Sequence, residues 1–104
     1  MNEDFLNFTN IDRIIHEPAR LMITTILYSV ESADFLYLQK ATDLTKGNLS
    51  SHLAKLETAG YVNIEKTYKG KLPLTICRLS EDGRHAYKSY KRQLSTFMEH
   101  IRGE

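Results

Sequence analysis

Four hydrogen-bonding side chains in the middle of the chain fall on one side of a predicted helix. They are Lys46, Asn48, Ser51 and Lys55. The leucines of the same segment recur at helical spacing and form an apolar stripe on the other side. Ammonium, amide and hydroxyl groups arranged in this way can hydrogen-bond base edges and phosphate oxygens. The same arrangement is also that of an ordinary solvated helix face, so the neighbouring segments must decide between the two.

The ends of this helix are marked by residues with distinct physical roles. The hydroxyl of Thr45 can cap the first turn by accepting a backbone hydrogen bond, and Gly60 can adopt the left-handed conformation that ends a helix. We therefore predict a helix within residues 45–59. His52 lies on the boundary between its apolar and polar sides, and we expect it to pack or to bind a phosphate rather than to sense pH.

A second basic cluster follows in a predicted β-hairpin over residues 61–79. β-branched and aromatic residues occupy both halves, and the sequence KGKLP supplies the turn between them. We expect Lys69 and Lys71, with Lys66 beside them, to contact phosphates or a narrow minor groove. Arg78 has two open interpretations, a phosphate contact or an ion pair with Glu65 across the hairpin.

The distribution of charge favours a polyanionic partner for these two segments. The net charge of the whole chain is only +1. However, residues 45–79 hold six basic and two acidic side chains, whereas residues 1–44 hold three basic and seven acidic ones. The positive charge therefore lies on the segment with the polar helix face, which favours double-stranded DNA as the partner.

Two further helices are expected earlier, within residues 11–44. The first runs over residues 18–29, where apolar side chains recur at helical spacing and Pro18 fits the first turn. The second begins after a cap at Ser32 or Asp34. Its expected inward side chains are Phe35, Leu36 and Leu38, and its expected outward ones are Gln39, Lys40 and Thr42. This second helix and the one within residues 45–59 match a helix-turn-helix pair.

A final helix over residues 80–101 carries an apolar stripe that a core of this size cannot cover. Left exposed, such a stripe would be a large apolar patch on a monomer. We expect it to be the contact surface of a homodimer, whose two-fold symmetry would present two recognition helices to a palindromic site. The residues expected at this surface are Tyr87, Tyr90, Leu94, Phe97, Met98 and Ile101.

The order helix, helix, helix, hairpin, helix resembles a winged helix-turn-helix DNA-binding domain. More narrowly, the chain resembles small dimeric transcriptional regulators related to the MarR and ArsR families, through LSSHLAKLETAGYV at residues 49–62 and LSEDGR at residues 79–84. The resemblance implies a mainly α fold with a small β-hairpin (α+β) and a homodimeric regulator, usually a repressor. In such a domain residues 46–59 enter the major groove and residues 66–71 touch the flanking backbone. Thr45, Ser50 and His52 then join the candidate DNA contacts.

The remaining features narrow the class of protein. The 104 residues form one domain, without a membrane span or a leader, so we expect a cytoplasmic protein. Cys77 is the one cysteine, which excludes an internal disulfide. The scattered histidines lack the spacing of a metal site. No cofactor motif or catalytic pair is evident. Residues 35–40 lack the cysteine pair of metal-sensing relatives, which excludes metal sensing at that site. The existence of a small-molecule effector is left open. The alternative function is a winged-helix module that binds protein in a larger complex.

Overall fold

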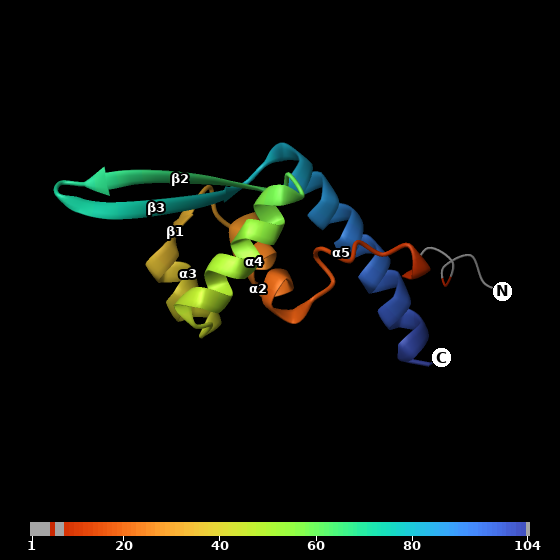
Figure 1. The fold of residues 1–104 in the computed structure, drawn as a ribbon. Coiled ribbons are helices and arrows are strands. Elements are labelled where there is room, and N and C mark those ends of the chain that lie inside the picture. The colour runs from red at the N-terminus through yellow and green to blue at the C-terminus, as the bar shows by residue number, and fades with distance from the viewer. Residues whose placement is uncertain (1–4, 6–7, 104) are drawn as a thin grey trace.

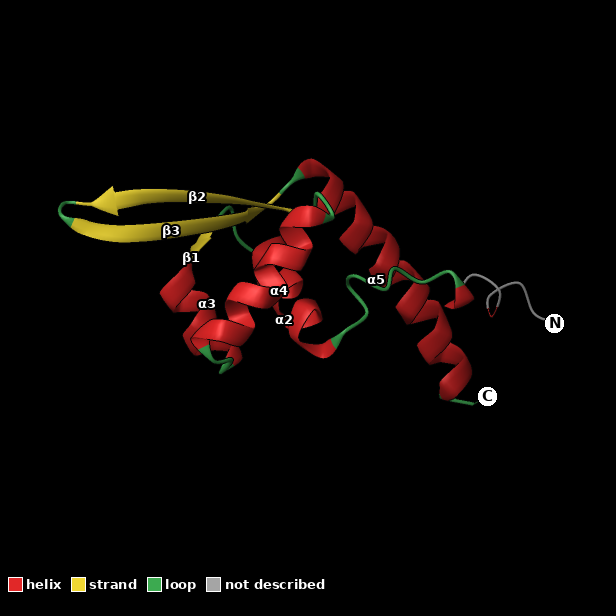
Figure 2. Cartoon of the chain, viewed as in Figure 1, coloured by secondary structure: helices red, strands yellow, loops and turns green. Residues whose placement is uncertain are grey.

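The computed structural model describes residue 5 and residues 8–103. Its elements follow in the order α2 (Pro18–Tyr28), β1 (Ala33–Asp34), α3 (Phe35–Thr42), α4 (Lys46–Thr58), β2 (Val62–Lys69), β3 (Leu72–Leu79) and α5 (Glu81–Ile101). The three helices α2, α3 and α4 pack together, and the β2–β3 hairpin projects from them as a wing (Figures 1 and 2). The predicted α+β winged-helix fold is confirmed.

Local sequence signals set the helix boundaries as expected. The Thr45 hydroxyl accepts a hydrogen bond from the Asn48 N–H at 3.1 Å and starts α4. Gly60 follows α4 with a φ of 84°, a left-handed conformation that a side chain would strain. Ser80 caps α5 through the Gly83 N–H at 2.9 Å. Of the two caps considered for α3, Asp34 is the one used, through the Tyr37 N–H at 2.8 Å.

The sheet contains one strand that the sequence did not reveal. β2 and β3 are antiparallel, with Val62 opposite Leu79 and Lys69 opposite Leu72. β1 adds two residues to the outer side of β3, so the strand order is β1-β3-β2. A strand of two residues has no periodicity to detect, yet it ties the start of α3 to the base of the wing.

The main core lies between the three packed helices and the base of the wing, and it corrects the predicted orientation of α3. Leu38 is fully buried as expected. Leu36, however, is 68% exposed and Thr42 only 7% exposed, so the inward and outward assignments of these two residues are wrong. Leu38 and Thr42 are one turn apart and share the buried side of α3. The Thr42 hydroxyl donates a hydrogen bond to the Leu38 carbonyl at 2.7 Å.

A second apolar cluster joins α5 to the segment before α2. Ile11 and Ile15 cover Tyr87 and Tyr90, which are both buried within the chain. The two phenol groups are also satisfied internally, since Tyr87 Oη lies 2.8 Å from Thr25 Oγ1 and Tyr90 Oη lies 2.8 Å from His16 Nδ1. The expectation that these tyrosines lie on an uncovered stripe is therefore wrong, because the N-terminal segment crosses α5 and covers them.

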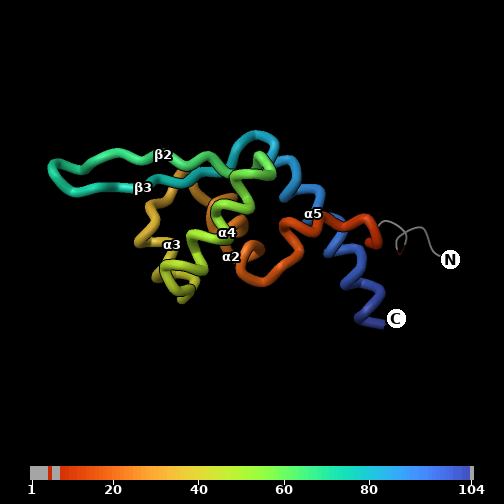
Figure 3. The backbone as a smooth tube through the Cα atoms, viewed as in Figure 1, coloured from red at the N-terminus to blue at the C-terminus, as the bar shows by residue number. Residues whose placement is uncertain are grey.

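The molecule is elongated, with extents of 58 × 25 × 21 Å. The tip of the wing forms one end, and the C-terminal part of α5 forms the other (Figure 3). At that far end Phe97 stacks on Phe8 with ring centroids 3.9 Å apart. Ile101 is 60% exposed and Met98 is also exposed, so the last turns of α5 keep an open apolar side.

Candidate nucleic-acid interface

The predicted polar face of α4 is open to solvent along its length. Leu49, Leu53 and Leu56 are buried against the core, which turns the opposite side of the helix outward. We call this outward side the recognition face. It carries Lys46, Asn48, Ser50, Ser51 and Lys55, all exposed. Thr45 is exposed as well, although its hydroxyl is engaged as the cap of α4.

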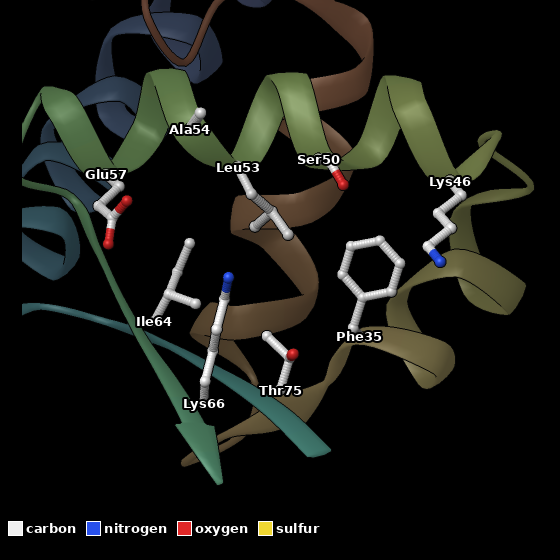
Figure 4. Close-up of a pocket in the computed structure, with 9 residues that line it drawn as sticks. All are labelled: Phe35, Lys46, Ser50, Leu53, Ala54, Glu57, Ile64, Lys66 and Thr75. Atoms are coloured by element: carbon white, nitrogen blue, oxygen red, sulfur yellow. The ribbon is translucent and has the colours of Figure 1, made fainter. Parts of the chain in front are cut away.

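One edge of the recognition face borders a groove of about 710 Å³ between α4 and the wing. Its floor is apolar, with Leu53 and Ile64 between the two elements. The ammonium groups of Lys46 from α4 and Lys66 from β2 both point into it (Figure 4). Glu57 lies at the end of the groove opposite Lys46 (Figure 4). The groove therefore joins an apolar floor to two cations from separate elements.

The wing lysines do not share one side of the hairpin. Lys66 stands opposite Thr75 in the register, and both line the groove toward α4. Lys69 stands opposite Leu72. Because successive side chains of a strand alternate between faces, Lys69 faces the other side of the sheet. Lys71 lies between the strands at the tip, and all three lysines are exposed.

The structure contains the ion pair that was one of the two interpretations of Arg78. Arg78 Nη2 lies 3.5 Å from Glu65 Oε1 across the hairpin. Both side chains are largely exposed, so the pair contributes little to stability. Its position shows that Arg78 belongs to the face of the wing that points away from α4.

Two side chains at the start of α2, which the sequence interpretation did not single out, lie close to His52. Arg20 Nη1 lies 3.0 Å from His52 Nδ1, and Glu17 Oε1 lies 3.9 Å from the same nitrogen. Burial raises the pKa of Glu17, but the hydrogen bond from the Arg20 N–H and nearby positive charge outweigh it and lower the net value. The available signal was Arg20 itself, a charged residue on the buried side of α2.

Burial also raises the pKa values of two other ionisable groups, Cys77 and Tyr61. Cys77 is fully buried in β3, and desolvation, followed by Asp34 and Glu57, raises its pKa to about 11. Desolvation raises the pKa of Tyr61 to about 12, helped by its hydrogen bond to Asp12 at 2.5 Å. Both groups are neutral structural elements at physiological pH.

The predicted dimer residues divide into buried and open ones. Leu94 and Phe97 are half-buried beside the covered tyrosines, and Met98 and Ile101 remain exposed.

Among residues 5 and 8–103, no three His, Cys, Asp or Glu side chains gather where they could hold a metal ion. Within that same part of the chain, every helix is too short or too polar to cross a membrane.

Comparison with known proteins places this geometry in a family. The family described as a winged helix DNA-binding domain matches residues 19–98. An uncharacterized protein of Methanocaldococcus jannaschii is 39% identical over 79 residues, which are 75% of this chain and 85% of that protein. A transcriptional regulator homologue from Pyrococcus horikoshii OT3 has a similar structure, with a TM-score of 0.86 and 29% identity over 96% of this chain and 98% of its own.

The same fold occurs in a protein from Enterococcus faecalis V583 that is described as a putative transcriptional regulator of the MarR family. The TM-score is 0.76 and the identity 19%, over 97% of this chain and 90% of that one. The family is described as a DNA-binding one, and the two solved structures are described as a transcriptional regulator homologue and a putative transcriptional regulator. From the match over residues 19–98, the fold and the exposed polar side of α4, the chain belongs to the winged helix DNA-binding domain family.

Proposed function

We propose that the chain is a cytoplasmic, homodimeric transcriptional repressor that binds a palindromic operator in double-stranded DNA. The observation that carries this proposal is the recognition face of α4, exposed along its length, with the groove between α4 and the wing beside it. The family and the relatives give no support to the alternative of a protein-binding module.

The dimensions of α4 suit the major groove. Its 13 residues span about 20 Å at the usual rise of a helix, and a B-DNA major groove admits a helix of this kind. Asn48 and Ser51 lie in the middle of the recognition face and can bond base edges. Lys55, on the same face, can reach base edges or the phosphates that border them.

The groove beside α4 suits one strand of the DNA backbone. Its apolar floor at Leu53 and Ile64 matches the sugar edge of the strand, and Lys46 and Lys66 supply cations for its phosphates. Glu57 at the far end would repel phosphates, which favours a strand that approaches from the Lys46 end (Figure 4). The tip lysines Lys69 and Lys71 can then meet the flanking backbone.

The dimer proposal depends on the far end of α5. Tyr87 and Tyr90 are covered within the chain, so the partner would contact the later turns, where Met98 and Ile101 are exposed. Phe5 is exposed as well, with its ring centroid 5.9 Å from that of Phe97. Burying this apolar surface against a second copy is favourable at about 25 cal/mol per Å², and it would place two recognition faces in one assembly.

Gel shifts on DNA upstream of the chain's own gene test this proposal. We expect a shift at low salt that weakens as salt rises, because bound phosphates release counterions. Lys46→Ala should weaken binding. Lys88→Ala removes an exposed lysine of α5 and serves as the matched control with unchanged binding. Absence of any shift at low salt would contradict the proposal.

A further inference from the structure

The guanidinium group of Arg20 is buried and fixed in orientation. Arg20 is only 9% exposed on α2. Its Nε donates a hydrogen bond to the Ile14 carbonyl at 2.6 Å, and its Nη1 lies 3.0 Å from His52 Nδ1 on α4. The two contacts hold the plane of the guanidinium against one edge of the imidazole ring.

This contact decides which ring nitrogen of His52 carries the proton. Every nitrogen of a guanidinium is a donor and none is an acceptor. The partner atom, Nδ1, must therefore accept, and the proton of the neutral ring must be on Nε2. A proton on Nδ1 would set two donors against each other at 3.0 Å. Glu17 Oε1, at 3.9 Å from Nδ1, lies beyond hydrogen-bond distance and cannot replace the contact.

The other nitrogen of the ring is open to solvent. Within the described part of the chain, no buried side-chain nitrogen or oxygen lacks a hydrogen-bond partner. His52 Nε2 makes none of the hydrogen bonds found there, so it is not buried. The side chain as a whole is 20% exposed. An N–H donor without a protein partner is thus presented at the surface of α4.

The Nε2 donor of His52 and the groove lie on opposite sides of the recognition face. Two residues along a helix correspond to about 200° of rotation, so His52 and the groove residue Ser50 lie on opposite edges of the recognition face. His52 neighbours Asn48 and Lys55, which are one turn away on either side. A helix in the major groove has a phosphate backbone on each side. With α4 in that groove, the wing edge would meet one backbone and the His52 edge would meet the other.

We propose that Arg20 is a positioning residue, which fixes the tautomer of His52 so that its Nε2–H donates to a phosphate oxygen on the DNA strand away from the wing. The proposal rests on the proposed function, because it requires DNA against α4. It adds a contact between His52 and a phosphate, assigns the Nε2–H tautomer to that ring, and names Arg20 on α2 as the residue that imposes this tautomer.

Nitrogen NMR of the imidazole rings in the free protein tests the protonation state without DNA. We expect the Nε2–H tautomer for His52, identified among the four histidines by its loss in His52→Gln. A ring with its proton on Nδ1, or a doubly protonated ring at neutral pH, would overturn the proposal. Arg20→Met should give a mixture of tautomers. Should that variant fail to fold, the wild-type spectrum still decides the point.

DNA binding by variants tests the phosphate contact. His52→Ala should weaken binding on the order of tenfold with an unchanged salt slope, because a neutral donor releases no counterion. His52→Gln keeps a donor and should recover most of the affinity. Arg20→Met alone should weaken DNA binding. Added to His52→Ala, it should cause little further loss of affinity. His85→Ala, an exposed histidine of α5, is the control and should change nothing.

Two results would separate this inference from the proposed function. If the wild type binds DNA and His52→Ala binds equally well, the phosphate contact is wrong while the proposed function stands. If His52→Ala instead lowers the salt slope by about one, the ring is charged and the assigned tautomer is wrong. If the wild type binds no DNA at low salt, the proposed function and the phosphate contact are both overturned.

Discussion

The first turn of α5 lies directly on the backbone of Tyr61, with Gly83 at the contact. A Cβ atom on Gly83 would collide with the Tyr61 carbonyl oxygen. The same carbonyl accepts a hydrogen bond from the Ser80 N–H at 2.9 Å. The end of α4, the base of the wing and the start of α5 therefore meet at a point with no room for a side chain.

Gly83→Ala is expected to destabilise the fold. The added methyl group meets backbone atoms that cannot rotate away, so the cost should be about 1–3 kcal/mol. Denaturant unfolding measures it. Gly47→Ala is the matched control, since a Cβ there meets nothing within 4 Å, and it should raise stability by up to about 1 kcal/mol through helix propensity. Equal effects of the two substitutions would contradict the close contact at Gly83.

Lys66 is expected to contribute more to DNA binding than its neighbour Lys69. Lys66 points into the groove beside α4 (Figure 4), whereas Lys69 faces the other side of the sheet. Lys66→Ala should lower the salt slope of binding by about one. Lys69→Ala should weaken binding to all sequences about equally, with a smaller loss of slope. A larger effect at Lys69 would mean that the wing meets DNA with its opposite face.

Asn48 and Ser51 are expected to govern sequence choice rather than overall affinity. Both lie in the middle of the recognition face, and base edges carry the sequence information that phosphates lack. Asn48→Ala should reduce the preference for operator over random DNA by about 1–3 kcal/mol. Competition titrations with operator and scrambled duplexes measure this preference. Equal weakening on both duplexes would place Asn48 on the backbone instead.

Cys77 is expected to be unreactive in the folded protein. It is fully buried, and desolvation raises its pKa to about 11, so very little thiolate is present at neutral pH. A thiol reagent should label it only as fast as the chain unfolds. Rapid labelling under native conditions would show that β3 opens locally.

The charge of Glu17 should stabilise the fold only above its folded-state pKa. The folded state lowers this pKa below 4.5, so the charged form is favoured by folding. The contribution is fully present above pH 4.5 and is lost as pH falls through the lower folded value. Unfolding of wild type and Glu17→Gln should therefore differ at neutral pH and converge in acid. A constant difference would exclude a role for the charge.

The parts of the fold that depend on local chemistry were predictable from the sequence. Thr45 and Ser80 cap their helices through hydrogen bonds to residues three positions away, and Gly60 ends α4 with a left-handed conformation. The leucine spacing in α4 likewise defines the recognition face without knowledge of the partner elements.

The features that sequence reasoning missed all depend on contacts between distant segments. Thr42 is buried because the packing of α3 selects its orientation. Tyr90 is covered by residues almost eighty positions earlier, which no helical periodicity could reveal. The contact of Arg20 with His52 joins residues 32 positions apart, so the site could be predicted for α4 itself but not for its support from α2.

DNase footprinting on the operator tests the central claim most directly. We predict two protected half-sites with centres about 10–10.5 base pairs apart, related by two-fold symmetry, with both weakened together in Lys46→Ala. This pattern requires α4 in the major groove and two chains per site. A single asymmetric footprint would contradict the homodimer, and no protection at low salt would contradict DNA binding by this face.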